Sequence, residues 1–168
     1  MGHEDRGQPA PDVSREHRFV ADAMLGRLAR WLRFLGFDTL YYPHISDSRL
    51  VRIAMEQERT ILTRDTGLVK RKGIREHVLL VHASDPFEQL VEVKDALHLS
   101  ESSPLSRCVA CNGLLDGVTD KSDIKDSVPD YVFLKVDAFF RCRECGRVYW
   151  EGSHPKLFKK KLRGLFNH

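Results

Sequence analysis

The stretch FVADAMLGRLARWLRFLGFDTLYY, residues 19–42, contains the pattern that decides the fold. Residues 19–22 are apolar and end at an acid, which is typical of a short buried strand. Over residues 24–35 apolar side chains recur at helical spacing, and Gly36 is the kind of residue that ends a helix. TLYY (39–42) is β-branched and aromatic, which favours a second strand. This stretch therefore predicts a strand, a helix and a second strand in succession.

The alternation of strands and helices continues to residue 98. Ser46 is a suitable N-cap for the next predicted helix, and the apolar run HVLLVHA (77–83) is typical of a strand buried on both faces. Such alternation predicts an α/β fold, with a parallel sheet, right-handed crossovers and helices on both faces. The remaining predicted elements are a helix over 47–58, a strand over 60–63, a short basic segment over 70–75 and a helix over 86–98.

Composition and length place the chain among soluble proteins with a true core. It has 168 residues, of which 42% are hydrophobic and 30% charged, and its formal net charge of +3 indicates little about partners. No apolar run approaches the roughly 20 residues that span a bilayer. The polar N-terminus lacks the apolar stretch of a secretory signal, so we expect a disordered leader over 1–17 and a cytoplasmic protein.

A polar, proline-containing segment over 100–106 marks a predicted domain boundary. It separates an α/β domain over 18–100 from a cysteine-containing module over 106–155. A basic C-terminal tail over 156–168 follows, and a local basic tail can recruit a polyanion even when net charge is small. The alternative for this tail is a solvated, frayed helix.

All four cysteines lie beyond this boundary, in two C-x-x-C pairs. Two such pairs fit a tetrahedral structural zinc ion, because each tight turn points both thiolates at one metal and four thiolates leave no open position for catalysis. Disulfides are the alternative, and a reducing cytoplasm disfavours them. Strand-like segments surround the pairs, over 131–136 (YVFLKV), 139–140 (FF) and 147–150 (RVYW), and predict a small β zinc ribbon. The predicted zinc ligands are Cys108, Cys111, Cys142 and Cys145.

Three aspartates, Asp22, Asp47 and Asp65, each fall just past a predicted strand. Because the carboxyl ends of parallel strands lie on one edge of the sheet, we expect these carboxylates to gather there. Clustered carboxylates repel one another, and hard oxygen ligands select Mg²⁺ or Mn²⁺. Asp85, after the fourth predicted strand, is a further candidate ligand. The alternative is that each acid only caps a helix or starts a turn.

Basic residues flank this predicted pocket. Arginines spaced by three along the first helix match the charge and bidentate geometry of a phosphate backbone. A second basic group extends the surface toward Asp65. The alternative is an ordinary solvated helix face. The candidate RNA-binding residues are Arg27, Arg30, Arg33, Arg64, Lys70, Arg71 and Lys72.

Four segments closely resemble the Mut7-C family: FVADAMLGRLARWLRFLGFDT, ERTILTRD, RCVACNGLL and FFRCRECGRVYWEGSH. The resemblance covers about residues 18–160. It implies a PIN-like nuclease domain followed by a zinc ribbon. In the PIN-like pattern one acid closes the first strand, a second starts a later helix and a third follows the LTRD strand, which correspond here to Asp22, Asp47 and Asp65. The fourth acid common in PIN domains has Asp85 as its candidate.

Two functions are consistent with these patterns. The first is an endoribonuclease in which the aspartates hold Mg²⁺ or Mn²⁺ and the basic residues position the RNA. The second is a non-catalytic RNA-binding adaptor on the translation machinery, in which the ribbon and the lysine-rich tail make the contacts. A phosphoryl-accepting receiver domain and a dinucleotide-binding domain fit poorly. Ala23 follows Asp22 where a receiver has a second acid, and the first strand–helix turn has no glycine-rich loop.

Overall fold

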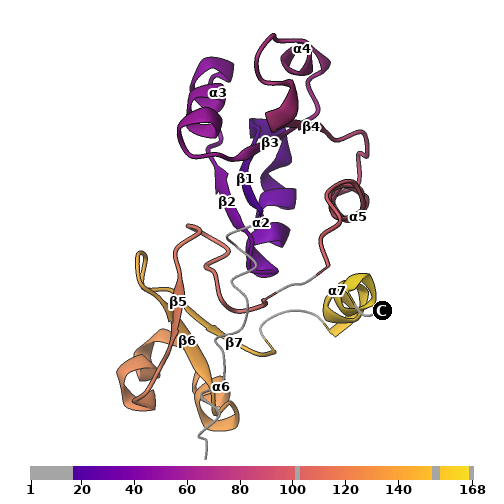
Figure 1. Ribbon diagram of the computed structural model, residues 1–168. Helices are drawn as coiled ribbons and strands as arrows, with labels where there is room; N and C mark the ends of the chain where they lie inside the picture. The colour runs from indigo at the N-terminus through magenta and orange to yellow at the C-terminus, as the bar shows by residue number, and fades with distance from the viewer. Residues whose placement is uncertain (1–16, 101–102, 153–155, 167–168) are drawn as a thin grey trace, which may run out of the picture.

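The computed structural model describes residues 17–100, 103–152 and 156–166 (Figure 1). It contains a four-stranded parallel sheet and a separate three-stranded antiparallel sheet. The predicted leader over 1–17 lies outside the described residues apart from His17. Among the described helices, none has both the length and the apolar character that a bilayer-crossing segment requires.

The parallel sheet has the strand order β2-β1-β3-β4. β1 (Arg18–Ala21) lies between β2 (Asp38–Tyr41) and β3 (Thr60–Thr63), and β4 (Val78–Leu80) forms the far edge. This confirms the predicted parallel α/β fold and leaves β2 and β4 as edge strands. The connecting helices are η1 (Ala23–Leu25), α2 (Gly26–Phe34), α3 (Asp47–Glu56), α4 (Thr66–Val69), η2 (Arg75–His77) and α5 (Pro86–Ala96). We call residues 18–99 the α/β unit.

The core of the α/β unit has one layer on each face of the sheet. Along β1 the side chains alternate, as strand geometry requires, so that Phe19 and Ala21 join one layer and Val20 joins the other. The first layer contains the apolar faces of α2 and α5, and the second those of α3 and α4. Burial on both faces explains why the strands are continuously apolar.

The antiparallel sheet belongs to the cysteine module, which we call the ribbon (residues 106–152). Its strands are β5 (Leu115–Gly117), β6 (Phe139–Cys142) and β7 (Val148–Trp150), in that order. Between β5 and β6 lie η3 (Lys121–Ser127) and α6 (Asp130–Lys135). Figure 1 places the ribbon beyond one end of the parallel sheet.

The predicted strand over 131–136 is wrong, because these residues form helix α6. Val132 is buried, and Phe133 and Val136 pack against the same small core, which is a helical spacing. Tyr131 and Leu134 point to solvent. A short, mostly apolar run does not distinguish a buried strand from a short helix, and the sequence pattern therefore favoured the wrong element here.

The last described element, α7 (Lys156–Phe166), packs back on the α/β unit beside α5 (Figure 1). Leu162 is 4% exposed and belongs to the same core layer as α2 and α5, with Leu165 and Phe166 packed against that layer. The Lys94 Nζ lies 6.0 Å from the centre of the Phe166 ring. The segment expected to be a basic tail over 156–168 thus contains a helix that completes the core.

Candidate functional site

The Thr63 hydroxyl joins two of the three predicted aspartates at the carboxyl edge of the sheet. Its Oγ1 donates a 2.8 Å hydrogen bond to Asp22 Oδ2 and accepts a 3.0 Å bond from the Asp65 backbone N–H. Asp22 is 9% exposed and Thr63 is fully buried, whereas Asp65 is exposed. The ends of β1 and β3 therefore bring two of the three predicted acids to one shared hydroxyl. Thr63 was not predicted, since a buried threonine in a strand gives no separate signal.

The turn that follows Asp22 is fixed from strand β2. Asp22 Oδ1 accepts a 2.7 Å hydrogen bond from the Ala23 N–H, and the Tyr41 hydroxyl donates a 2.9 Å bond to the Ala23 carbonyl. The Tyr41 ring fills the space beside Gly26, where a Cβ would lie 2.8 Å from ring atoms. Gly26 is therefore needed for this close approach, and Tyr41 holds the turn that carries Asp22.

The predicted acids also have partners of their own. Asp47 lies in the first turn of α3 with its side chain 46% exposed, and its Oδ2 is 4.0 Å from Arg71 Nη2. Asp85 is the N-cap of α5, because its Oδ1 accepts hydrogen bonds from the Phe87 and Glu88 N–H groups. Asp65 likewise caps α4 through a 2.7 Å bond from Gly67 N–H.

The aspartates therefore do not form a close-packed ligand set. In the described part of the chain, the four cysteines are the one group of three or more His, Cys, Asp or Glu residues whose ligand atoms all lie within 4.8 Å of one another. A Mg²⁺ ion at the sheet edge would be held partly through water molecules. Mg²⁺ binds in this way in many proteins, keeping several waters and one or two carboxylates.

Six of the seven predicted RNA-binding residues lie on or near the surface. Those on α2 and around the end of α4 are exposed, and Arg64 is half-buried with its Nη2 3.2 Å from Ser84 Oγ. The ion pair of Arg71 with Asp47 is exposed and therefore weak. The exposed residues are Arg27, Arg30, Lys70, Arg71 and Lys72.

Arg33, the seventh, is instead buried, at 5% exposure, and has a structural role. Its Nε donates to the Thr39 carbonyl at 2.8 Å, and its Nη1 donates to the Val109 and Ala110 carbonyls at 3.1 and 3.0 Å. It therefore connects α2 to β2 and to the ribbon and cannot serve as a surface phosphate contact. A spacing of three along a helix does not show which face turns inward. The sequence pattern therefore could not show that Arg33 is buried while Arg27 and Arg30 are exposed.

The four thiols of the ribbon fit a tetrahedral metal. The Sγ atoms of Cys108 and Cys145 are 3.6 Å apart, and those of Cys111 and Cys142 are 3.4 Å apart. A zinc ion with Zn–S bonds of about 2.3 Å requires S–S edges of about 3.8 Å, close to this arrangement. All four cysteines are free, since disulfide bonding would need a separation of about 2.05 Å. The cluster is therefore compatible with a structural zinc ion.

Burial and hydrogen bonds together shift the pKa values of two thiols in the cluster in opposite directions. Burial, together with hydrogen bonds to the other three thiols, raises the pKa of Cys111 to about 12. Burial also opposes ionisation of Cys145, but its pKa falls to about 6 because it accepts hydrogen bonds from the Arg147 N–H and the other thiols. One thiolate thus forms readily and the next does not. The Tyr149 hydroxyl adds a 3.0 Å contact to Cys108 Sγ, and burial raises the pKa of that phenol.

Comparison with known proteins identifies one family. Residues 17–162 match a family model described as Mut7-C RNAse domain, which covers both the α/β unit and the ribbon. No curated protein and no solved structure matches the chain.

Proposed function

The chain belongs to the Mut7-C RNAse domain family, and from this membership we propose that it is a divalent-metal-dependent endoribonuclease that hydrolyses RNA phosphodiester bonds. The observation that best supports the location of the reaction is the hydrogen-bonded unit of Asp22, Thr63 and Asp65 at the carboxyl edge of the sheet. Ligands bind at this edge in open parallel sheets.

In this proposal Asp22 and Asp65 hold Mg²⁺ or Mn²⁺, with Asp47 acting through water and Asp85 as a further candidate ligand. Such an ion, when bound, activates water and neutralises charge that develops on the phosphodiester. Thr63 orients the Asp22 carboxylate, and each carboxylate oxygen can accept more than one bond. Tyr41 keeps the turn after Asp22 in place.

The basic surface would position the RNA strand. Arg27 and Arg30 on α2, together with Arg64 and the exposed group Lys70, Arg71 and Lys72, offer guanidinium and ammonium groups to phosphates. The ribbon, stabilised by zinc at its four thiols, would add contacts to nucleic acid. We also propose that the protein acts in the cytoplasm, where a reducing environment keeps the four thiols free to bind zinc.

The test is cleavage of RNA by the purified full chain. We expect cleavage with Mn²⁺ or Mg²⁺, no cleavage with EDTA, and a loss of about a hundredfold or more in the Asp22→Asn and Asp65→Asn variants, because the metal loses a charged ligand. Asp120→Asn is the matched control. Asp120 caps η3 in the ribbon through the Ser122 N–H, and asparagine caps as well as aspartate. If both edge variants cut RNA as well as wild type, the mechanism is wrong.

A non-catalytic RNA-binding adaptor that acts on the translation machinery is the second candidate. It is favoured by the capping roles of Asp22, Asp65 and Asp85, each of which accepts hydrogen bonds from backbone N–H groups of the helix that follows. This candidate predicts RNA affinity with a steep salt dependence and no turnover with any divalent ion. Turnover that requires Asp22 would exclude it.

A further inference from the structure

The two knuckles of the ribbon, residues 108–113 and 142–147, share one backbone requirement. The residue after the second cysteine has a positive φ in both, 71° at Asn112 and 73° at Gly146. Glycine adopts this conformation freely and asparagine does so more readily than most residues, for which the cost is about 1–2 kcal/mol. A Cβ on Gly146 would meet nothing within 4 Å. Since glycine satisfies the knuckle geometry, the asparagine at 112 calls for an explanation in terms of its side chain.

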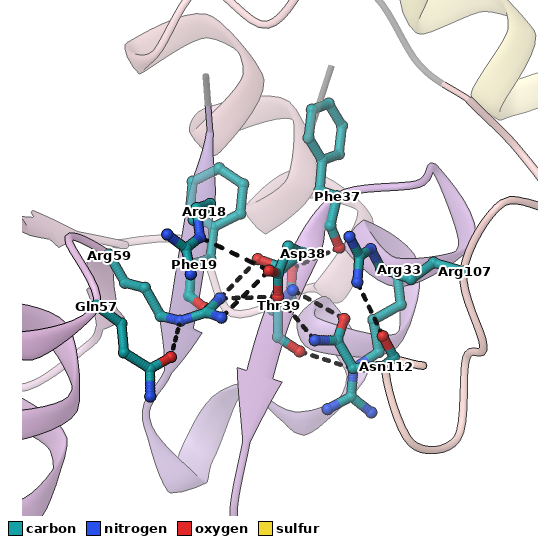
Figure 2. A network of polar contacts seen from close by, with 10 residues as sticks. All are labelled: Arg18, Phe19, Arg33, Phe37, Asp38, Thr39, Gln57, Arg59, Arg107 and Asn112. Carbon is teal, nitrogen blue, oxygen red and sulfur yellow. Dashed lines mark hydrogen bonds and ion pairs between the residues drawn. The ribbon is translucent and has the colours of Figure 1, made fainter. Parts of the chain in front are cut away.

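The Asn112 amide reaches out of the ribbon and binds strand β2 of the α/β unit (Figure 2). Its Oδ1 accepts a 3.0 Å hydrogen bond from the Thr39 N–H, and its Nδ2 donates a 2.8 Å bond to Asp38 Oδ1. The side chain is 8% exposed. Because β2 is an edge strand, the Thr39 N–H has no strand partner on this side. Asn112 thus satisfies a buried backbone donor that would otherwise be unpaired.

Arg33 closes the same junction from helix α2. It donates to the Thr39 carbonyl and to the carbonyls of Val109 and Ala110, which lie between the two cysteines of the first knuckle. The Thr39 N–H therefore binds Asn112 of this knuckle, and the Thr39 carbonyl binds Arg33, which also donates to the knuckle. Val109 also packs against the core layer of α2 and α5. The first knuckle is buried against the α/β unit by polar and apolar contacts alike.

We propose that the first knuckle is a structural part of the parallel sheet, so that zinc bound by the four thiols stabilises the α/β unit as well as the ribbon, with Asn112 as the linking residue. A metal ion that binds only the folded knuckle stabilises that fold, and with it the contacts that the knuckle makes to the α/β unit. The knuckle shape, with Asn112 at positive φ, presents the amide to Asp38 and Thr39. This linkage concerns folding and does not depend on RNA cleavage.

Amide hydrogen exchange of the full chain, with zinc bound and after chelation, tests the linkage. Zinc content is measured in parallel. We expect chelation to speed exchange of the Thr39 amide at least about tenfold and to lower the melting temperature of the α/β unit. Unchanged exchange at Thr39 after complete loss of zinc would overturn the proposal.

Two variants assign the linkage to Asn112. Asn112→Gly keeps the positive φ and all four thiols but removes the amide. We expect it to bind one zinc while its Thr39 amide exchanges rapidly even with zinc present. Gly146→Asn, which adds the same side chain to the other knuckle, is the matched control and should leave Thr39 protected. Protection of the Thr39 amide at the wild-type level in Asn112→Gly would overturn the role of Asn112.

The chelation experiment on the wild-type chain needs no variant, so the proposal stays testable if Asn112→Gly fails to fold.

Discussion

At the scale of single residues, a hydroxyl group organises the sheet edge. Thr63 Oγ1 uses its proton on Asp22 and a lone pair on the Asp65 N–H. Its side chain is fully buried, so water cannot replace these two bonds. Thr63 Oγ1 thus helps to position both Asp22 and Asp65, the two candidate metal ligands.

Replacing Thr63 with valine should therefore disturb the edge without changing the shape of the strand. We expect Thr63→Val to lower the free energy of unfolding by about 1–3 kcal/mol, because Asp22 Oδ2 and the Asp65 N–H lose their partner. The rate of RNA cleavage should fall roughly tenfold to a hundredfold through misplacement of Asp22. Denaturant unfolding and a cleavage assay measure the two effects. Thr60→Val in the same strand is the control, and equal effects at both positions would contradict this role of Thr63.

At the scale of elements, helix α7 shows that a basic segment can complete a core. Exposed Lys160, Lys161 and Arg163 explain why the segment looks like a solvated tail, whereas Leu162 lies inside the layer formed by α2 and α5. Lys161 Nζ also lies 5.4 Å from the centre of the Phe87 ring on α5. Among the side chains described in this helix, the buried Leu162 and two cation–π contacts therefore hold it to the α/β unit.

Leu162→Ala tests whether α7 belongs to the folded unit. Removing a fully packed leucine leaves a cavity, so the free energy of unfolding should fall by about 2–4 kcal/mol. Arg163→Ala, one residue further along, removes only an exposed contact with Glu151 at 3.9 Å and should change stability by less than about 1 kcal/mol. Chemical denaturation measures both. A Leu162→Ala variant as stable as Arg163→Ala would show that α7 does not stabilise the core.

Helices α6 and α7 also mark the limit of sequence reasoning about elements. The four strands and helices α2, α3 and α5 of the α/β unit follow from periodicity, since each spans a buried face with regular spacing. The short helices α4 and η2 instead border the predicted basic segment over 70–75. Residues 131–136 are apolar except for Lys135, so the sequence suggested a strand, and only the packing of Val132 and Val136 on one small core selects the helix. For α7 the many basic residues suggested a solvated tail. Its apolar residues Leu162, Leu165 and Phe166 gave no sign of their partners, because these lie in α2 and α5, far away in the chain.

At the scale of the whole molecule, the α/β unit and the ribbon are joined by a polar junction centred on Asp38. Arg59 binds both oxygens of Asp38, at 2.8 and 3.2 Å, and Asn112 adds a third bond (Figure 2). Burial alone would raise the pKa of Asp38, but the bonds from Arg59 and Asn112 outweigh it and hold the pKa below its usual value. The ionised carboxylate is therefore part of the folded junction.

Because the folded junction contains an ionised Asp38, the free energy of unfolding should fall in acid. A carboxyl whose pKa is lower in the folded state stabilises the fold above its unfolded pKa of about 3.9, and this contribution is lost as the pH falls through the folded pKa. We expect the unfolding free energy of wild type to drop below about pH 4, and Asp38→Asn to be less stable at pH 7 with a shallower acid decline. Unfolding curves from pH 7 to 2 measure this. Parallel declines in both proteins would show that Asp38 is not responsible.

The sequence by itself determined the parallel α/β fold and the four-thiol cluster, through the apolar period and the two C-x-x-C pairs, and it indicated the family through the resemblance of four segments. Of the three aspartates expected to gather at the sheet edge, Asp22 and Asp65 share the Thr63 hydroxyl. Only the tertiary structure decided that Arg33 turns inward, that Thr63 joins two acids, that Asn112 caps β2 and that Leu162 enters the core. The reason is physical. A polar side chain acquires its role from partners that lie tens of residues away, and a local pattern does not specify which face those partners cover.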